Sequence, residues 1–228
     1  MQLNIEIPTG IVPAEGILPA LRKVVNDAVA AGVARLPGGE TEVSCRAGCG
    51  ACCRQLVPIS DIEARALAAL VERQPEPRRA ALRARFEDVA RRLDEAGLGE
   101  AALAPTRQPM AEQKTLAARY FSQALPCPFL EAESCSIHPE RPLVCREYLV
   151  TSPAALCATA GHPDIDPVAV PHLSTLAPRI TAPDTGRRDT MALPMLFRWL
   201  DKNPTAPAPR PAEEWMGRFL AAAREASS

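Results

Sequence analysis

Eight cysteines carry the most evident chemistry of this 228-residue chain, and they fall into two groups. The first group is Cys45-x3-Cys49-x2-Cys52-Cys53, and the second is Cys127, Cys135, Cys145 and Cys157, which begins after 73 residues without a cysteine. Short spacings let one turn present several sulfurs to one ion, and thiolate sulfur is the soft ligand that selects zinc or iron–sulfur clusters. The pattern therefore predicts a metal site that uses all eight cysteines, so the two groups must meet in space.

Two other interpretations of the first group are weaker. Buried free cysteines are common in apolar cores, but here four lie within nine residues, flanked by Gly48, Gly50 and arginines rather than by an apolar stripe. Cys-x3-Cys-x2-Cys is also the spacing of radical S-adenosylmethionine enzymes. Those enzymes usually have an aromatic residue before the third cysteine, where this chain has Ala51, and they need alternating strands and helices that the sequence does not show. Metal binding is favoured over core or redox thiols.

The number of ions is left open by the sequence. Eight sulfurs suit two separate four-thiolate zinc sites, or one cluster with spare thiols. Adjacent Cys52 and Cys53 are expected to point in different directions, so Cys53 is either a spare thiol or a ligand of a polynuclear site. His138, three residues after Cys135, could donate a nitrogen, whereas His162 and His172 are expected at the surface.

Charged residues beside the cysteines suggest how the site could be tuned. Arg46, Arg54 and Arg146 each follow a cysteine directly. Guanidinium groups there would lower thiol pKa values and offset the negative charge of a four-thiolate centre. Glu147 and Tyr148 are the only acid–base pair near the cysteines, and helix surface and core packing are their expected roles.

Composition excludes several classes of function. Lys plus Arg is 26 and Asp plus Glu is 27, so the net charge of −1 gives no general attraction to nucleic acid. No run of about 18 apolar residues occurs that would span a membrane. Residues 1–8 lack the basic and apolar regions of a signal peptide. We therefore expect a cytoplasmic protein whose partner is a metal ion, and whose thiols are kept reduced rather than joined as disulfides.

Hydrophobic periodicity predicts a mostly helical chain. Helices are expected over 17–36, from the capping box at Ser60 to about 74, over 78–97, over 106–125 with Met110, Ala117, Tyr120, Phe121 and Ala124 facing inward, over 190–202 and over 211–226. Pro142 should open a helix carrying Cys145, and Pro153 a short helix that carries Cys157 and stops at Gly161. The only strand-like segment is 3–7.

Two proline-rich segments, 163–183 and 204–209, read as linkers. The predicted fold is a single, mostly α domain organised around a cysteine-rich metal site. Within it we expect a helical lead-in over 1–40, a cysteine-cluster metal-chelating domain over 41–160, and a Pro-rich linker with C-terminal helices over 161–228 that packs on the same domain.

The motifs around the cysteines resemble those of a known family. They are Cys45-x3-Cys49-x2-Cys52-Cys53-Arg54, Cys127-Pro128-Phe129-Leu130, Cys135-Ser136-Ile137-His138-x2-Arg141-Pro142-x2-Cys145-Arg146-Glu147-Tyr148, and Cys157 after Thr151-Ser152-Pro153. In order and spacing they resemble the CxxxCxxCC, or YkgJ-like, family of zinc- or iron-chelating domains. One departure is His138, where many relatives carry Tyr. The resemblance implies chelation of zinc or iron and leaves the biological role undefined.

Two classes of function follow from these observations. One is a metal-binding protein with a structural or carrier site, which a closed four-thiolate shell would indicate. The other is an iron–sulfur redox or methyl-transfer enzyme, which an open coordination position would indicate. Some flagellin lysine methylases carry a similar cysteine pattern, but that resemblance covers the cysteines only, and no S-adenosylmethionine site is evident in the sequence.

Overall fold

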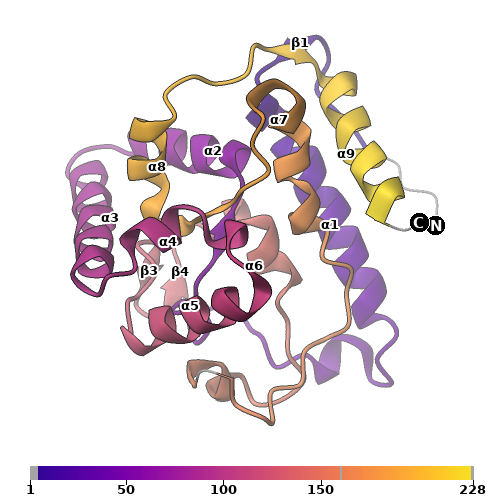
Figure 1. Ribbon diagram of the computed structural model, residues 1–228. Coiled ribbons are helices and arrows are strands. Elements are labelled where there is room, and N and C mark those ends of the chain that lie inside the picture. Colours follow the sequence, from indigo (N-terminus) through magenta and orange to yellow (C-terminus); the bar gives the residue numbers. More distant parts are fainter. Residues whose placement is uncertain (1–4, 160, 227–228) are drawn as a thin grey trace.

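The computed structural model describes residues 5–159 and 161–226, and it is mostly helical, as predicted (Figure 1). The α-helices are α1 Leu18–Val33, α2 Asp61–Glu72, α3 Arg78–Glu95, α4 Gly99–Leu103, α5 Met110–Ser122, α6 Leu143–Glu147, α7 Pro178–Thr185, α8 Leu196–Lys202 and α9 Ala212–Ala226. The strands are β1 Ile11–Val12, β2 Pro58–Ile59, β3 Leu130–Glu131, β4 Ser134–Cys135, β5 Met191–Ala192 and β6 Arg210–Pro211.

The six short strands form three antiparallel pairs that fasten distant segments. β1 pairs with β6, β2 pairs with β5, and β3 pairs with β4 in a hairpin. Each strand has two residues, which is too short to show an alternating pattern in the sequence. The strand predicted over 3–7 is not found, because residues 5–7 are irregular and residues 3 and 4 lie outside the described residues.

Most helices follow the predicted ranges, with three differences. The helix predicted over 190–202 begins only at Leu196, because Met191–Ala192 forms β5 and Leu193–Met195 forms a 3-10 helix. α4 was not expected, and α5 begins at Met110 rather than near 106, because Pro105–Arg107 forms a separate 3-10 turn. The predicted inner face of α5 is wrong for Met110, Ala117 and Ala124, which are exposed. Tyr120 is buried as predicted and Phe121 is half-buried, and the helix also buries Leu116. It is therefore rotated relative to the stripe that hydrophobicity alone suggested.

The first proline-rich segment is not simply a linker, because it contains α7. Pro178 occupies the first turn of this helix, where its missing N–H costs no hydrogen bond. Buried Ile180 and Thr181 hold the helix in place, and the Thr181 hydroxyl donates to Asp61 Oδ2 of α2 at 2.7 Å. The second segment, 204–209, has no helix or strand, as expected of an extended spacer. The predicted segment boundaries at 40 and 160 stay predictions.

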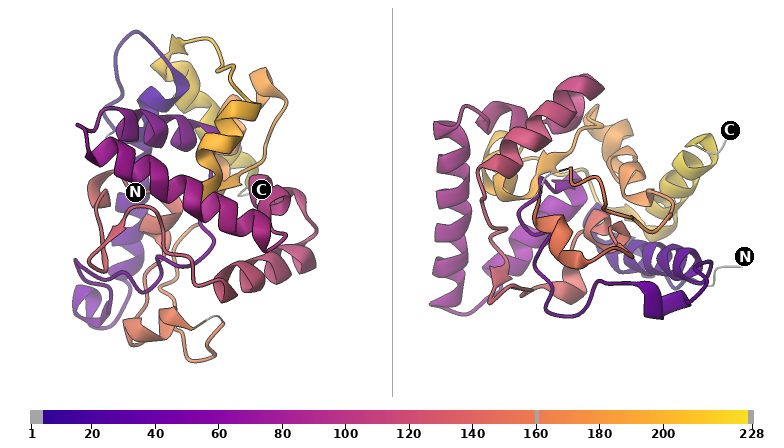
Figure 2. Two further views of the ribbon diagram at one scale, coloured as in Figure 1. Left: turned by 90° about the vertical axis from the view of Figure 1, so that its left-hand side faces the viewer. Right: turned by 90° about the horizontal axis from the view of Figure 1, so that it is seen from below.

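Two apolar clusters make most of the core. The first joins α2, α3, α4, α5 and α8 with Phe129, and the second joins α1, α7 and α9 with Ile62 and Leu143. Figures 1 and 2 show α3 on one side of the molecule and α1 with α9 on the opposite side. Cys127 and Cys135 pack against the first cluster, and Leu143, two residues before Cys145, belongs to the second. The cysteine region therefore lies where the two clusters meet.

A buried carboxylate links the start of α2 to the start of α6. The predicted capping box is present, since Glu63 Oε2 accepts hydrogen bonds from the Ser60 N–H at 2.9 Å and the Ser60 hydroxyl at 2.7 Å. Glu63 Oε1 also accepts the Leu143 N–H at 2.8 Å, across 80 residues of sequence. One side chain thus caps two helices, the second of which carries Cys145.

Among the described residues, we find no helix that combines the length and the apolar character needed to cross a bilayer.

Replacing Glu63 with Ala should destabilise the protein by about 2–4 kcal/mol, because it leaves the buried N–H groups of Ser60 and Leu143 unpaired. The free energy of unfolding in urea measures this loss. Glu72→Ala, in the same helix, is the control: Glu72 makes an exposed ion pair with Arg83 and its loss should change stability by only about 0.5 kcal/mol. Equal effects of the two changes would contradict the linking role of Glu63.

Candidate metal centre

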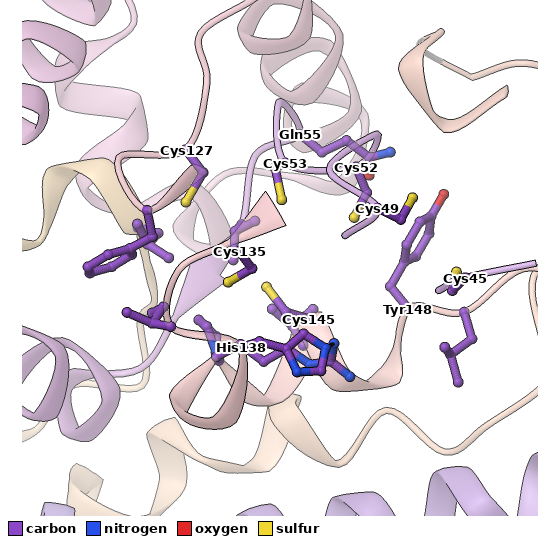
Figure 3. A pocket seen from close by; sticks show the side chains of 18 of the residues that line it. Cys45, Cys49, Cys52, Cys53, Gln55, Cys127, Cys135, His138, Cys145 and Tyr148 are labelled. Atoms are coloured by element: carbon purple, nitrogen blue, oxygen red, sulfur yellow. Dashed lines mark hydrogen bonds between the residues drawn. The ribbon is translucent and has the colours of Figure 1, made fainter. Parts of the chain in front are cut away.

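Seven of the eight cysteines line one cavity of about 160 Å³ (Figure 3). They are Cys45, Cys49, Cys52, Cys53, Cys127, Cys135 and Cys145. The eighth, Cys157, is buried beside the cavity, and its sulfur lies 3.8 Å from the hydroxyl of Tyr148, which lines it. The predicted meeting of the two groups across 73 residues is confirmed at the level of this shared cavity.

Successive tight turns present the first group. The Cys49 N–H donates to Arg46 O at 3.0 Å, the Cys53 N–H to Gly50 O at 3.0 Å, and the Gln55 N–H to Cys52 O at 3.0 Å. In such turns neighbouring side chains need not alternate as they do in a strand. Cys52 and Cys53 both line the cavity, and the interaction with the Cys53 thiol is the largest cause that raises the pKa of Cys52. The expectation that these two side chains point apart is therefore wrong.

Three different elements carry three cysteines of the second group, and Cys127 lies in the loop before β3. Cys135 lies on β4 of the hairpin, Cys145 in α6, and Cys157 in a 3-10 helix over Ala154–Ala158. This 3-10 helix stands where a short helix was predicted. Pro142 and Pro153 sit one position before their helices rather than in the first turn, because both have extended ψ angles of 156° and 122°.

Hydrogen bonds between main-chain segments hold the two groups together. The Cys127 N–H donates to Cys53 O at 2.7 Å. At the other end of the first group, the Ser44 N–H donates to Val150 O at 2.9 Å, and the Ser44 hydroxyl donates to Thr151 O at 2.8 Å. None of these bonds uses a thiol, so the chain brings the segments together without sulfur ligation.

The β3–β4 hairpin lies directly against the first group. Arg54 donates two hydrogen bonds to the Glu133 carboxylate, at 3.0 and 2.7 Å. Gly50 approaches the hairpin so closely that a Cβ there would lie 2.6 Å from Glu133 O and 2.7 Å from Leu130 Cδ1. Ala132 and Glu133 form the hairpin turn with φ angles of 48° and 58°. The hairpin therefore places Cys135 against the Cys49–Cys53 turn through contacts that need glycine at position 50.

Burial and mutual repulsion disfavour ionised thiols in this cavity. Burial raises the pKa of Cys127 to about 12. Burial, followed by the charges of Cys127 and Cys52, raises the pKa of Cys145 well above its ordinary value. The hydrogen bond to Cys53 and then burial raise the pKa of Cys52. Without a cation these thiols stay protonated at neutral pH, and a bound cation would reverse that preference.

The thiols of this cavity have the chemistry and the number that a soft cation needs. They are not, however, already arranged around a single ion position. Within residues 5–159 and 161–226, no three His, Cys, Asp or Glu side chains converge closely enough to hold one ion. The sulfurs line the walls of the cavity instead, and ligation would require thiol side chains to turn inward. Sulfur chemistry, the number of thiols and their mutual repulsion all fit zinc or iron.

The three histidines have different surroundings. His138 lines the cavity, and its Nε2 accepts a hydrogen bond from the Arg141 guanidinium. Burial, together with the charges of Arg141 and Arg146, lowers the pKa of His138. His172 is exposed as expected, while His162 is partly buried and accepts the Asp164 N–H. Neither of these two lines the cysteine cavity.

Glu147 and Tyr148, the acid–base pair noted in the sequence, face different sides of α6. Tyr148 faces the cavity. Glu147 is buried on the other side of α6, where it accepts the N–H of Ser174 at 2.7 Å and its hydroxyl at 2.6 Å. Glu147 therefore anchors the end of α6, and Tyr148 is the member of the pair with access to the thiols.

The arginines around the thiols differ from those chosen from the sequence. Of the three that follow a cysteine, only Arg46 lines the cavity. Arg54 is bound to Glu133, and Arg146 donates to the carbonyls of Arg141 and Pro139.

Two cavity residues were missed by sequence reasoning. They are Arg141 and Gln55, whose Nε2 also donates to Cys157 O at 3.4 Å. Arg141 lies between Cys135 and Cys145 in the sequence, and this position could have marked it as a residue near the thiols. Nothing in the sequence marks Gln55.

The metal-free protein should lose stability as pH rises above about 9. The pKa of Cys127 is 9.0 without burial and about 12 in the fold, so the folded form keeps a proton that the unfolded form loses. The stabilising contribution is complete below pH 9 and is lost as pH rises toward 12. Unfolding in urea across this range measures the slope. Cys127→Ala should flatten it, and Ser136→Ala, beside Cys135 and without a titrating group, should not.

Gly50→Ala should displace the hairpin from the first cysteine group, because the new methyl group overlaps a main-chain carbonyl. We expect a loss of several degrees in melting temperature and faster labelling of Cys135 by a thiol reagent. Gly217→Ala is the matched control: a Cβ there meets nothing within 4 Å, and this helical site should become more stable by about 0.5–1 kcal/mol. Unchanged labelling in Gly50→Ala would contradict the close approach.

Comparison with known proteins agrees with the chemistry of this cavity. The family model CxxCxxCC, described as a putative zinc- or iron-chelating domain, matches residues 44–162. That match covers slightly more than half of the 228 residues and includes all eight cysteines. Searches of curated proteins and of solved structures gave no match. The chain therefore belongs to the CxxCxxCC family of zinc- or iron-chelating domains.

Proposed function

We propose that this protein chelates zinc, iron or an iron–sulfur cluster through its eight cysteines. The observation that carries the proposal is that two segments 73 residues apart place seven thiols around one cavity. All eight cysteines are free thiols, as metal ligation requires. Free thiols also agree with the reducing conditions of the cytoplasm, where we propose that the protein acts.

The surroundings of the thiols suggest how ligation is shared. Burial first, and then nearby Cys49, Cys52 and Cys157, raise the pKa of Cys45, so these four cysteines lie in one neighbourhood, which defines one set. Charges of Cys127, Cys52 and Cys135 act on Cys145, which defines another. Figure 3 shows Cys127, Cys135 and Cys145 on one side and Cys45 and Cys49 on the other, with Cys52 and Cys53 between.

This arrangement favours a polynuclear centre or two adjacent ions over a single four-thiolate ion. Cys52 and Cys53 lie at the junction of the two sets, and both line the cavity, so both sulfurs are candidates for ligation. Four thiolates complete the shell of one zinc ion or one cluster, and eight thiols provide two such sets.

A second candidate is an iron–sulfur enzyme that performs redox or methyl-transfer chemistry. One observation favours it: the Tyr148 hydroxyl lies beside the thiols and could exchange a proton with a bound molecule. A closed structural site would not need such a group.

Anaerobic metal analysis with an absorption spectrum distinguishes these cases. Broad visible absorbance with stoichiometric iron and sulfide would identify a cluster. A colourless protein with stoichiometric zinc would identify a zinc site. Protein prepared anaerobically that retains neither metal and binds neither on reconstitution would contradict chelation.

Single substitutions should separate ligands from bystanders. Cys49→Ser and Cys145→Ser replace a soft sulfur with a hard oxygen, so each should lose at least one metal equivalent and melt at a lower temperature. Tyr148→Phe changes a cavity residue without removing a sulfur, and it should keep its full metal content. Metal content by elemental analysis is the measurement. Full metal content and stability in both serine variants would contradict the proposed site.

A further inference from the structure

We propose that the cysteine cavity also binds a small organic carboxylate, with its charged end at the guanidinium of Arg141 and near Arg46. This inference rests on the proposed function for the position of the metal, since the ligand would occupy the space beside it. The groups that would recognise the anion belong to the chain itself.

The size of the cavity is the first argument. A single water molecule needs about 10–15 Å³ of such space, so about 160 Å³ has room for on the order of ten waters. Thiol side chains that turn inward to hold one or two ions would take up part of this space. Arg46, Gly48 and His138 are exposed lining residues, so the remaining space is open to solvent on their side.

The walls of this space are apolar between the thiols. Leu56, Phe129, Ile137 and Leu149 are among the lining residues, and Phe129 and Ile137 are almost fully buried. Such walls offer no hydrogen bonds to water, so they favour contact with the hydrocarbon part of a ligand. A ligand that fits them is an organic molecule rather than a bare inorganic ion.

The charges of the lining specify an anion. Among the described residues around the cavity, the permanently charged side chains are Arg46 and Arg141, and no Asp or Glu is present. Arg141 donates to His138 Nε2, but its own Nε is buried without a hydrogen-bond partner in the described part of the chain. Because this Nε is sealed from solvent, a carboxylate in the cavity would accept from the terminal nitrogens of the Arg141 guanidinium, through two parallel bonds.

A carboxylate fits better than the other charged groups. A cationic ligand would face two arginines without any counter-charge. A phosphate is commonly held by several main-chain N–H groups at a helix start, whereas here the available donors are side chains set in an apolar wall. The remaining competitor is the metal–thiolate centre itself, whose negative charge could satisfy Arg141 directly.

Binding of n-butyrate to the metal-loaded protein, followed by NMR chemical shifts, tests the inference. n-Butylammonium and n-butanol are probes of similar size with opposite and no charge. We expect saturable chemical-shift changes with butyrate and not with the other two probes. In Arg141→Gln the affinity for butyrate should fall by about tenfold or more. Arg141→Lys keeps the charge and should retain part of the affinity. Arg46→Gln should also weaken binding, and its melting temperature must be compared with that of the original protein, because Arg46 donates to the carbonyls of Val43 and Cys45. Arg91→Gln is the control, because Arg91 lies outside the cavity, on the exposed face of α3, where it pairs with Asp88 and Glu95.

Several results would overturn the inference. They are an absence of saturable butyrate binding, equal binding of butyrate and butylammonium, or unchanged affinity in a folded Arg141→Gln protein. Loss of metal from Arg141→Gln, with no butyrate binding by the original protein, would show that Arg141 neutralises the metal centre instead. Butyrate binding through Arg141 in a protein that holds no metal would support the carboxylate site and contradict the proposed function, so the two failures are distinguishable.

Discussion

The central constraint on this structure is the cost of ionising several thiols that share one buried cavity, to which burial contributes most. Thiolates that close together also repel one another, so they cannot all be charged without a cation. The fold meets this constraint by leaving ligation out of its own assembly: main-chain hydrogen bonds from Ser44 and Cys127, and the Arg54–Glu133 pair, bring the cysteine segments together. The thiols are thus collected while protonated, and a metal can replace protons in a site whose frame already exists.

Glu63 gives this frame its connection to the rest of the molecule. Its carboxylate belongs to α2, which packs in the first apolar cluster through Leu67, while the N–H it accepts from Leu143 begins α6 in the second. Glu147 anchors the opposite end of α6 through Ser174. A helix of five residues is not stable alone. The position of Cys145 therefore depends on two buried carboxylates as much as on its own segment.

Local signals in the sequence were enough for much of this organisation. The Ser60–Glu63 capping box, the helices predicted over 17–36 and 211–226, and the cysteine spacing each report on neighbouring residues, and each is found in the structure. Features that depend on distant packing were missed: the rotation of α5, which buries Leu116, the helix α7 in a proline-rich segment, and the short strand pairs. Cys52 and Cys53 were misjudged because side-chain direction in consecutive turns follows backbone angles that residue types do not specify. Arg141 is brought to the thiols only by the tertiary fold.

The 73 residues between the two cysteine groups have a consequence for synthesis on the ribosome. At about 5–20 residues per second, the first group is translated about 4–15 s before Cys127, and Cys157 follows later still. During that interval a metal ion would meet at most four cysteines, without the hairpin or α6 beside them. The nascent chain therefore exposes a partial, exchangeable set of thiols, and the full donor set exists only after most of the protein has left the ribosome.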